Sequence, residues 1–198
     1  MASFWDQRYA VPEYIYGTEP NDFLAAQANR LQGTVLSLAE GEGRNGVFLA
    51  TLGLSVHGVD SSAVGLAKAE ALARERGVAI RTEVADLATF VPPPLAYDGV
   101  VSIFAHLPGT VRRRLYPRVE QTLKPGGWLI LEAYGMEQLP RSTGGPKDPD
   151  LLMSREKLLT EFPHLEPVYV WSGEREVCEG THHTGLAAVI QFLARKPA

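Results

Sequence analysis

Residues 34–60, TVLSLAEGEGRNGVFLATLGLSVHGVD, are the stretch from which we predict the fold. A short apolar run from Val35 to Ala39 is typical of a strand buried in a parallel sheet. Gly41, Gly43 and Gly46 follow with G-x-G-x-x-G spacing, which permits a tight turn and lets a ligand approach the backbone closely. The stretch therefore begins as a strand that leads into a ligand-binding turn.

A helix and a second strand complete this pattern. Residues 47–52 are predicted to be a short helix, so the glycine turn lies at a helix N-terminus, where free N–H groups favour a negative ligand group. The second strand ends on Asp60, about 20 residues after Gly41, which is the spacing of an acid that accepts hydrogen bonds from a ribose. Together these features indicate a site for an adenosine-containing cofactor.

Length and composition favour one domain over residues 1–198. Hydrophobic residues make up 45% and charged residues 21%, which are ordinary globular values, and no apolar run approaches the roughly 18 residues that cross a membrane. The N-terminus lacks the features of a secretory signal, and the single cysteine fits a reducing compartment. The net charge of −4 gives no electrostatic reason to expect nucleic acid or a membrane as a partner. We expect a cytoplasmic monomer or homodimer that acts on a small molecule.

The rest of the chain predicts an α/β fold, a doubly wound Rossmann-like sheet of seven strands. After the first two strands, we expect strands at 78–84, 97–104, 128–134, 166–172 and 186–195, and helices at 21–31, 61–76, 110–123 and 154–162. Three prolines at 92–94 indicate a stiff connector in place of one helix. The link 173–185 is too short for a helical crossover, so the sheet should be mostly parallel with an antiparallel last strand.

Several candidate residues follow the carboxyl ends of predicted strands, where ligands gather in open α/β sheets. Asp86 follows the third strand and His106 the fourth. The hairpin between the last two strands brings Glu179 and His183 to the same side. We expect residues 1–33 to form an N-terminal flap, with an aromatic segment that includes Tyr16, followed by a helix. We expect residues 135–154 to form a loop at the same edge of the sheet. Residues 1–20 carry Pro12 and Pro20, so we expect little regular structure there.

Two cofactors fit the glycine turn and Asp60, namely a nicotinamide dinucleotide and S-adenosylmethionine. No tyrosine has lysine four positions later, as the short-chain reductases require, and a zinc alcohol dehydrogenase would need cysteine ligands that are missing. Glu40 lies at the start of the turn, and a carboxylate suits a sulfonium and an ammonium group better than a pyrophosphate. We expect Glu40 to attract the ammonium group.

The sequence resembles the class I S-adenosylmethionine-dependent methyltransferases, in the branch of the bacterial TehB-type and thiopurine-type enzymes. The matching stretches are VLSLAEGEGRN at 35–45, VD at 59–60, ADL at 85–87, YDGVVS at 97–102 and LKPGGWL at 123–129. Two positions depart from the pattern: Ser37 replaces the usual acid and Ala39 the usual first glycine.

The resemblance implies S-adenosylmethionine as the methyl donor and S-adenosylhomocysteine as the product. The implied cofactor-binding residues are Ala39, Glu40, Gly41, Gly43, Asn45, Asp60, Ser61, Asp86, Leu87 and Phe104. His106, His183 and Tyr16 are the candidates for positioning the substrate.

The expected reaction is methyl transfer to a small acceptor, such as a thiol or a chalcogen oxyanion. Two other functions remain open: an NAD(P)-dependent oxidoreductase, and a non-catalytic protein that binds S-adenosylmethionine. We expect no metal site at Glu179, His182 and His183, because adjacent histidines on an extended segment point to opposite faces.

Overall fold

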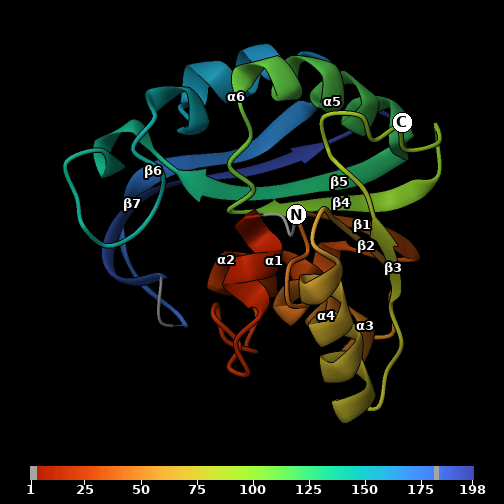
Figure 1. Cartoon of the computed structure of the whole chain (residues 1–198). Coiled ribbons are helices and arrows are strands. Elements are labelled where there is room, and N and C mark those ends of the chain that lie inside the picture. The colour runs from red at the N-terminus through yellow and green to blue at the C-terminus, as the bar shows by residue number, and fades with distance from the viewer. Residues whose placement is uncertain (1–3, 181–182) are drawn as a thin grey trace.

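Seven strands form one sheet in the order β3-β2-β1-β4-β5-β7-β6 in the computed structural model, which describes residues 4–180 and 183–198 (Figure 1). The strands are β1 (Thr34–Leu38), β2 (Ser55–Asp60), β3 (Arg81–Val84), β4 (Tyr97–Ile103), β5 (Leu123–Tyr134), β6 (Glu166–Glu179) and β7 (His183–Arg195). Strands β1 to β5 pair in parallel, and β7 is antiparallel to both β5 and β6. The predicted fold class, including the antiparallel last strand, is confirmed.

Helices cover both faces of the sheet (Figure 1). They are α1 (Phe4–Tyr9), α2 (Asp22–Gln27), α3 (Arg44–Thr51), α4 (Ala63–Glu75), α5 (Gly109–Thr122) and α6 (Arg155–Glu161), with short 3₁₀ turns at Ala28–Arg30, Met136–Gln138 and Pro149–Leu151. The first four helices lie on one side, and α5 and α6 lie on the other. Asn21, Ser62 and Ser154 cap α2, α4 and α6 through their side chains.

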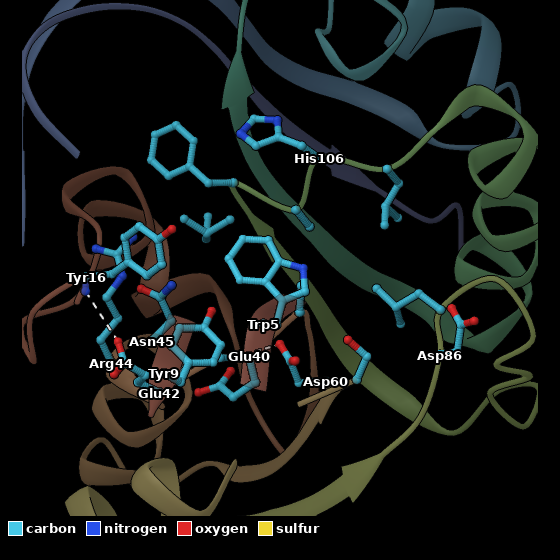
Figure 2. Close-up of a pocket in the computed structure, with 18 of the residues that line it drawn as sticks. Trp5, Tyr9, Tyr16, Glu40, Glu42, Arg44, Asn45, Asp60, Asp86 and His106 are labelled. Atoms are coloured by element: carbon cyan, nitrogen blue, oxygen red, sulfur yellow. Dashed lines mark hydrogen bonds between the residues drawn. The ribbon is translucent and has the colours of Figure 1, made fainter. Parts of the chain in front are cut away.

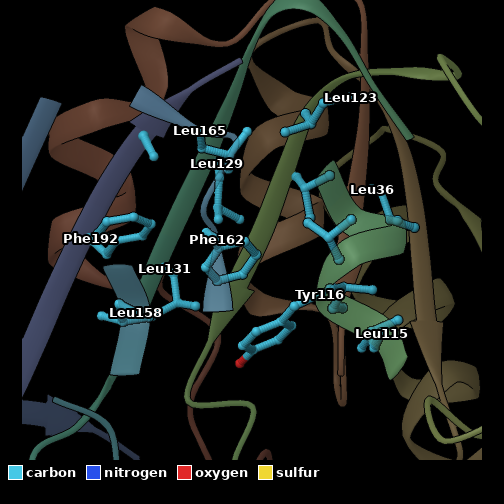
Figure 3. Packing of buried hydrophobic residues seen from close by; sticks show 14 of the residues in the cluster. Leu36, Leu115, Tyr116, Leu123, Leu129, Leu131, Leu158, Phe162, Leu165 and Phe192 are labelled. Carbon is cyan, nitrogen blue, oxygen red and sulfur yellow. The ribbon is translucent and has the colours of Figure 1, made fainter. Parts of the chain in front are cut away.

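Two apolar layers follow from the alternation of side chains along the strands. Leu36 and Leu129 belong to the layer beneath α5 and α6, where Tyr116 stacks on Phe162 with ring centroids 4.4 Å apart (Figure 3). Val35, next to Leu36, belongs instead to the layer beneath α2 and α3. The central strands of the sheet are therefore buried on both sides, and their ends are the part left for a ligand.

Several boundaries differ from the prediction. Strands β6 and β7 extend to Glu179 and from His183, through residues that we expected to form a link. This extension was not predicted because the inward positions of this part of β6 are mostly polar, as at Arg175 and Glu179, so its alternating burial is not matched by an alternation of apolar and polar residues. At the other end of the chain, α1 forms within a segment predicted to be irregular, because Pro12 lies beyond the helix and does not interrupt it.

Strand β3 is shorter than predicted. It starts at Arg81, because the Val78 N–H donates to the Ala73 carbonyl at the end of α4 and is not paired with β2. Strand β5 is longer than predicted, since it starts at Leu123 and includes the Lys-Pro-Gly-Gly segment at 124–127, where Gly126 has φ of 77°.

No helix in the described part of the chain has the length and apolar character needed to cross a membrane.

Candidate functional site

A cavity of about 430 Å³ lies at the carboxyl ends of the central strands (Figure 2). Its walls come from the segments that follow β1, β2, β3 and β4, from the N-terminal segment and from the start of β7. The residues that line it are Trp5, Tyr9, Tyr16, Gly17, Ala39, Glu40, Gly41, Glu42, Arg44, Asn45, Asp60, Ser61, Asp86, Leu87, Ala88, Ile103, Phe104, Ala105, His106, Leu107, Pro108, Val111 and His183.

The turn after β1 brings bare backbone to this cavity. Ala39 and Gly41 both have positive φ, 52° and 60°. A Cβ atom on Gly41 would lie 2.9 Å from the Tyr9 hydroxyl oxygen, so glycine is needed there for close packing as well as for the turn. The Gly41 N–H donates to Asp60 Oδ2 over 2.8 Å, which ties the turn to the end of β2.

Gly43 differs from the other predicted cofactor-binding residues, because it does not line the cavity. It is the N-cap residue of α3, with φ of 96°. A Cβ atom there would lie 2.6 Å from the Cα of Ala69, so this glycine allows α3 to pack closely on α4. Every other predicted cofactor-binding residue lies on the wall of the cavity, as do Tyr16, His106 and His183. The candidate Glu179 does not line the cavity, because it is buried in an ion pair with Arg44.

Asp60 presents a buried carboxylate at the middle of the cavity. Its Oδ1 accepts from the Ser62 N–H over 2.8 Å, and Oδ2 accepts from Gly41. Burial raises the pKa of Asp60, while these backbone donors oppose the shift. Each carboxylate oxygen has a second lone pair, so Asp60 can also accept hydrogen bonds from two neighbouring hydroxyls.

Glu40 lies at the base of the cavity and holds the start of α3. Its Oε1 accepts from the Gly46 N–H over 2.8 Å, and its Cγ lies 2.8 Å from where a Cβ on Gly58 would be. Burial raises the pKa of Glu40 to about 7. The carboxyl group therefore has a structural role that the sequence did not reveal, and attraction of an ammonium group by Glu40 stays a prediction.

The polar groups follow one another across the cavity. Figure 2 shows Asp86 at one end, Asp60 near the middle, and Glu42 and Arg44 at the opposite end. Asp86 Oδ1 accepts from the Ala88 N–H over 2.8 Å and shapes the turn after β3. Glu42 is paired with Lys68 and accepts from the Tyr16 N–H over 3.4 Å. This order suits an elongated ligand with different groups along its length.

Aromatic and imidazole rings gather at another part of the wall. Phe104 lies 4.9 Å from His183 and 4.8 Å from Tyr134 between ring centroids, and His106 stacks on Tyr134 at 5.3 Å. Tyr16 lies 4.6 Å from His183. Phe104, Tyr16 and the two histidines line the cavity, with Tyr134 packed behind them.

The polar atoms of this aromatic group are buried and neutral. Burial lowers the pKa of His106 to about 4 and that of His183 to about 3, and it raises the pKa of Tyr134. Among the described residues, no well-formed hydrogen bond reaches either ring nitrogen of His106, Nδ1 of His183 or the Tyr134 hydroxyl. Buried polar atoms without partners are uncommon, so His106 and His183, which line the cavity, can offer ring nitrogens to a ligand.

The N-terminal segment closes one side of the cavity. Trp5 stacks on Tyr9 with centroids 5.7 Å apart, and Arg8 donates to the Tyr16 hydroxyl over 3.0 Å. The Ser62 hydroxyl donates to Asp6 Oδ1 over 2.7 Å, which ties α1 to the start of α4. The segment 135–154 contributes no residue to the cavity wall.

Sequence reasoning missed several residues of the wall. Glu42 and Arg44 lie within the glycine turn, so their position was a usable signal. Trp5 and Tyr9 are distant in sequence, and only the aromatic composition of the N-terminal segment pointed to them. In the described ranges 4–180 and 183–198, no group of three potential metal ligands is found, and His182 lies outside them.

Comparisons with known proteins agree with this geometry. Residues 35–127 match the family model described as a methyltransferase domain. This match covers β1 to the start of β5, including the glycine turn, Asp60, Asp86 and His106. No curated protein matches the sequence significantly.

Solved structures share the fold at low sequence identity. A structure from work on the conversion of a disulfide bond into a thioacetal group during echinomycin biosynthesis is 20% identical, with a TM-score of 0.80 over 98% of this chain and 90% of that one. A SAM-dependent methyltransferase from Methanosarcina mazei is 19% identical, with a TM-score of 0.70 over 90% and 99%. TehB from Haemophilus influenzae is 18% identical, with a TM-score of 0.72 over 98% and 66%. These similarities show the fold, and the TehB-type branch in particular stays a prediction.

Proposed function

We propose that this chain transfers the methyl group of S-adenosylmethionine to a small-molecule acceptor such as a thiol or a chalcogen oxyanion. The match of residues 35–127 to a methyltransferase domain points to an S-adenosylmethionine-dependent enzyme. The observation that supports this most is the arrangement of groups in one cavity. Asp86, Asp60 and the glycine turn follow one another across it, and uncharged aromatic and imidazole rings line another part of its wall. The donor is S-adenosylmethionine, as the matched domain implies.

The residues of the cavity fit a sulfonium nucleoside. Asp60 has lone pairs left for the ribose hydroxyls, and we assign the adenine to the part of the cavity that Leu87 and Asp86 line. Gly41 contributes no side chain of its own to the cavity, and the Tyr9 hydroxyl packs where its Cβ would be. The buried guanidinium of Arg44 and carboxylate of Glu42 offer both charges at the far end, as an amino acid group requires.

The size of the cavity favours a small acceptor. Ligand pockets in proteins commonly enclose roughly 300–1,000 Å³. This cavity, at about 430 Å³, has to hold both a nucleoside cofactor and the acceptor. The acceptor would meet Phe104, His106 and His183, whose side chains are uncharged at neutral pH. Within the proposed acceptor classes, a neutral thiol suits this wall better than an oxyanion.

The chain's contribution to the reaction is alignment and exclusion of water. When bound, S-adenosylmethionine supplies an electrophilic methyl group on a positively charged sulfur. Phe104 and Tyr16 would hold the acceptor on the side of the cavity that they line, and the Trp5 and Tyr9 rings would shield it from solvent. A thiol acceptor needs no strong base near neutral pH. Because burial lowers the pKa of His106 to about 4 and that of His183 to about 3, both imidazoles are weak bases, and we assign them to positioning the acceptor.

Labelled S-adenosylmethionine incubated with matched acceptors tests this proposal. We would use a thiophenol, the corresponding phenol and selenite, and measure the transfer of label to each acceptor. We expect transfer to the thiol, with S-adenosylhomocysteine formed in equal amount. Tight binding of the cofactor with no transfer to any acceptor would favour the non-catalytic binder instead. The nicotinamide alternative is disfavoured by the antiparallel β7 between β5 and β6 and by the matched domain.

A further inference from the structure

Arg112 is a buried cation beside the cavity for which the proposed reaction has no direct use. It is the first of three consecutive arginines, of which Arg113 and Arg114 are exposed, whereas Arg112 is only 3% exposed. It lies near the start of α5, on the same face as Leu115 and Val119, which belong to the core beneath this helix. An apolar residue would suit this inward position, so the guanidinium needs partners that offset its burial.

The guanidinium of Arg112 holds three separate segments together. Its Nη1 donates to the carbonyl oxygens of Leu107 and Asp150, both over 2.6 Å. Its Nε donates to the two carboxylate oxygens of Glu161 in α6, over 3.1 and 2.9 Å. A planar group with several donors can make these bonds at once. Arg112 therefore connects the segment after β4 to the 3₁₀ turn Pro149–Leu151, while Glu161 balances its charge.

Residues 105–108 are the part of the cavity wall that this bridge fixes. They lie outside helices and strands, so contacts with other segments have to hold their path. His106 in this segment stacks on Tyr134 with ring centroids 5.3 Å apart. The bond from Arg112 to the carbonyl of the next residue, Leu107, therefore limits how far the imidazole can move.

The segment 135–154 gains an indirect role from the same bridge. It contributes no residue to the cavity wall, yet Asp150 in this segment accepts from Arg112 through its carbonyl oxygen. Its side-chain Oδ2 also accepts from the Gly109 N–H over 2.7 Å. Because Gly109 begins α5 directly after residues 105–108, the end of this part of the wall is held by two bonds to Asp150 and Arg112.

We propose that Arg112 is a positioning residue for the acceptor: by holding the Leu107 carbonyl beside that of Asp150, it keeps His106 in place on the cavity wall. This inference rests on the proposed function, in which the acceptor meets His106. Arg112 does not line the cavity itself, and Asp60 and the glycine turn, which we assign to the cofactor, belong to other segments. Its loss should therefore affect the acceptor and not the cofactor.

Steady-state kinetics and calorimetry on two variants test the proposal. Arg112→Met removes every donor, and we expect kcat/KM for a thiophenol acceptor to fall about tenfold or more, while the Kd of S-adenosylhomocysteine stays within about threefold. Arg112→Lys keeps the charge, but one ammonium cannot bond to all three partners in the same geometry. This variant should recover part of the stability, with kcat/KM still about fivefold or more below the wild type.

Two control variants separate this role from charge and stability. Arg113→Met removes the exposed neighbouring arginine and should leave kcat/KM and stability unchanged. Glu161→Gln removes the charged partner of Arg112 but keeps its bonds to the two carbonyl groups. It should lower the free energy of unfolding, because a buried charge loses its partner, while kcat/KM stays within about twofold.

A second measurement does not depend on turnover. Burial lowers the pKa of His106 to about 4. If Arg112 holds the segment that carries this imidazole, Arg112→Met should let water reach the ring, and the pKa should rise toward the ordinary value of 6.5. Proton NMR of the imidazole rings, assigned with His106→Ala, measures this pKa. Glu161→Gln should keep the wild-type value.

The outcomes are distinct. In Arg112→Met, a loss of affinity for S-adenosylhomocysteine as large as the loss of kcat/KM would overturn the proposal, as would an unchanged pKa of His106. Full wild-type activity in Arg112→Lys would also overturn it, and this variant decides the question by the same measurements if Arg112→Met does not fold. If the wild-type protein transferred no methyl group to any acceptor, the proposed function would fail, and the pKa of His106 would still show whether Arg112 holds this segment.

Discussion

Ala39 shows how this chain keeps the conformation of the glycine turn without the usual glycine. Its φ of 52° lies in the left-handed region, where a residue with a Cβ is strained by about 1–2 kcal/mol. Ser37, the other departure from the methyltransferase pattern, is buried and does not line the cavity. The two departures therefore leave the backbone path intact, and they give no structural reason to expect loss of cofactor binding.

Ala39→Gly should raise the free energy of unfolding by about 0.5–1 kcal/mol, because relief of strain exceeds the extra backbone entropy of glycine. Urea unfolding measures the change. Leu95→Gly is the matched control, since Leu95 has the same φ of 52° but is exposed and lies outside the cavity. Stabilisation of the Leu95 variant alone would mean that Ala39 is not strained.

Glu40 should make stability depend on pH in an unusual direction. Because its pKa rises from 4.5 to about 7 on folding, the folded state prefers the protonated form. The free energy of unfolding should therefore fall by about 3 kcal/mol as pH rises from 4.5 through 7, and this loss should be absent in Glu40→Gln.

Urea unfolding of both proteins at pH 5, 6, 7 and 8 checks this prediction. His106 and His183 act in the opposite sense, since their lowered pKa values reduce stability as pH falls below 6.5. These histidines are present in both proteins, so the difference between the two curves reports Glu40. Parallel curves would contradict the assignment.

His106 should affect turnover more than cofactor binding. In His106→Ala we expect turnover to fall about tenfold or more, because the group that faces the acceptor is lost. The affinity for S-adenosylhomocysteine should stay within about threefold, equivalent to about 0.7 kcal/mol. The exposed His164 provides the control variant, His164→Ala. A large loss of cofactor affinity would instead assign His106 to the cofactor pocket.

The elements that carry the site were predictable where periodicity and turn chemistry agree. The strand from Val35, the glycine turn and the strand ending at Asp60 meet this condition. The polar extensions of β6 and β7 were not predictable, since most of their residues are polar and the two strands are held by pairing with each other, as between Cys178 and Thr184, with Val177 as a buried apolar residue.

Contacts between distant elements were the least accessible from the sequence. The ion pair of Arg44 with Glu179 joins residues 135 positions apart, and nothing in the local sequence of either marks the other. The same holds for α1, whose position over the cavity depends on contacts such as that of Asp6 with Ser62. Such contacts are set by the packing of the complete fold.

The helix α1 should slow release of the cofactor, because Trp5 and Tyr9 cover the cavity. In Trp5→Ala we expect the dissociation rate of S-adenosylhomocysteine to rise about fivefold or more, as measured by stopped-flow fluorescence. Phe4→Ala is the control, since Phe4 packs against Trp5 but does not line the cavity. Equal rates in the wild type and Trp5→Ala would mean that α1 does not act as a flap.

For the molecule as a whole, the topology explains why one cavity collects residues from Trp5 to His183. Because β1 to β4 are parallel, the turns that follow them lie at one edge of the sheet. The antiparallel pair β6 and β7, at one end of the strand order, brings the start of β7 to the same edge. The matched methyltransferase domain and the similar solved structures agree with this arrangement.

The most direct test of the central claim is calorimetric titration of the purified protein with S-adenosylhomocysteine and, separately, with NADH at the same concentrations. The cavity described here should take up S-adenosylhomocysteine saturably with one site per chain and show no saturable uptake of NADH. Saturable binding of NADH without binding of S-adenosylhomocysteine would contradict the account.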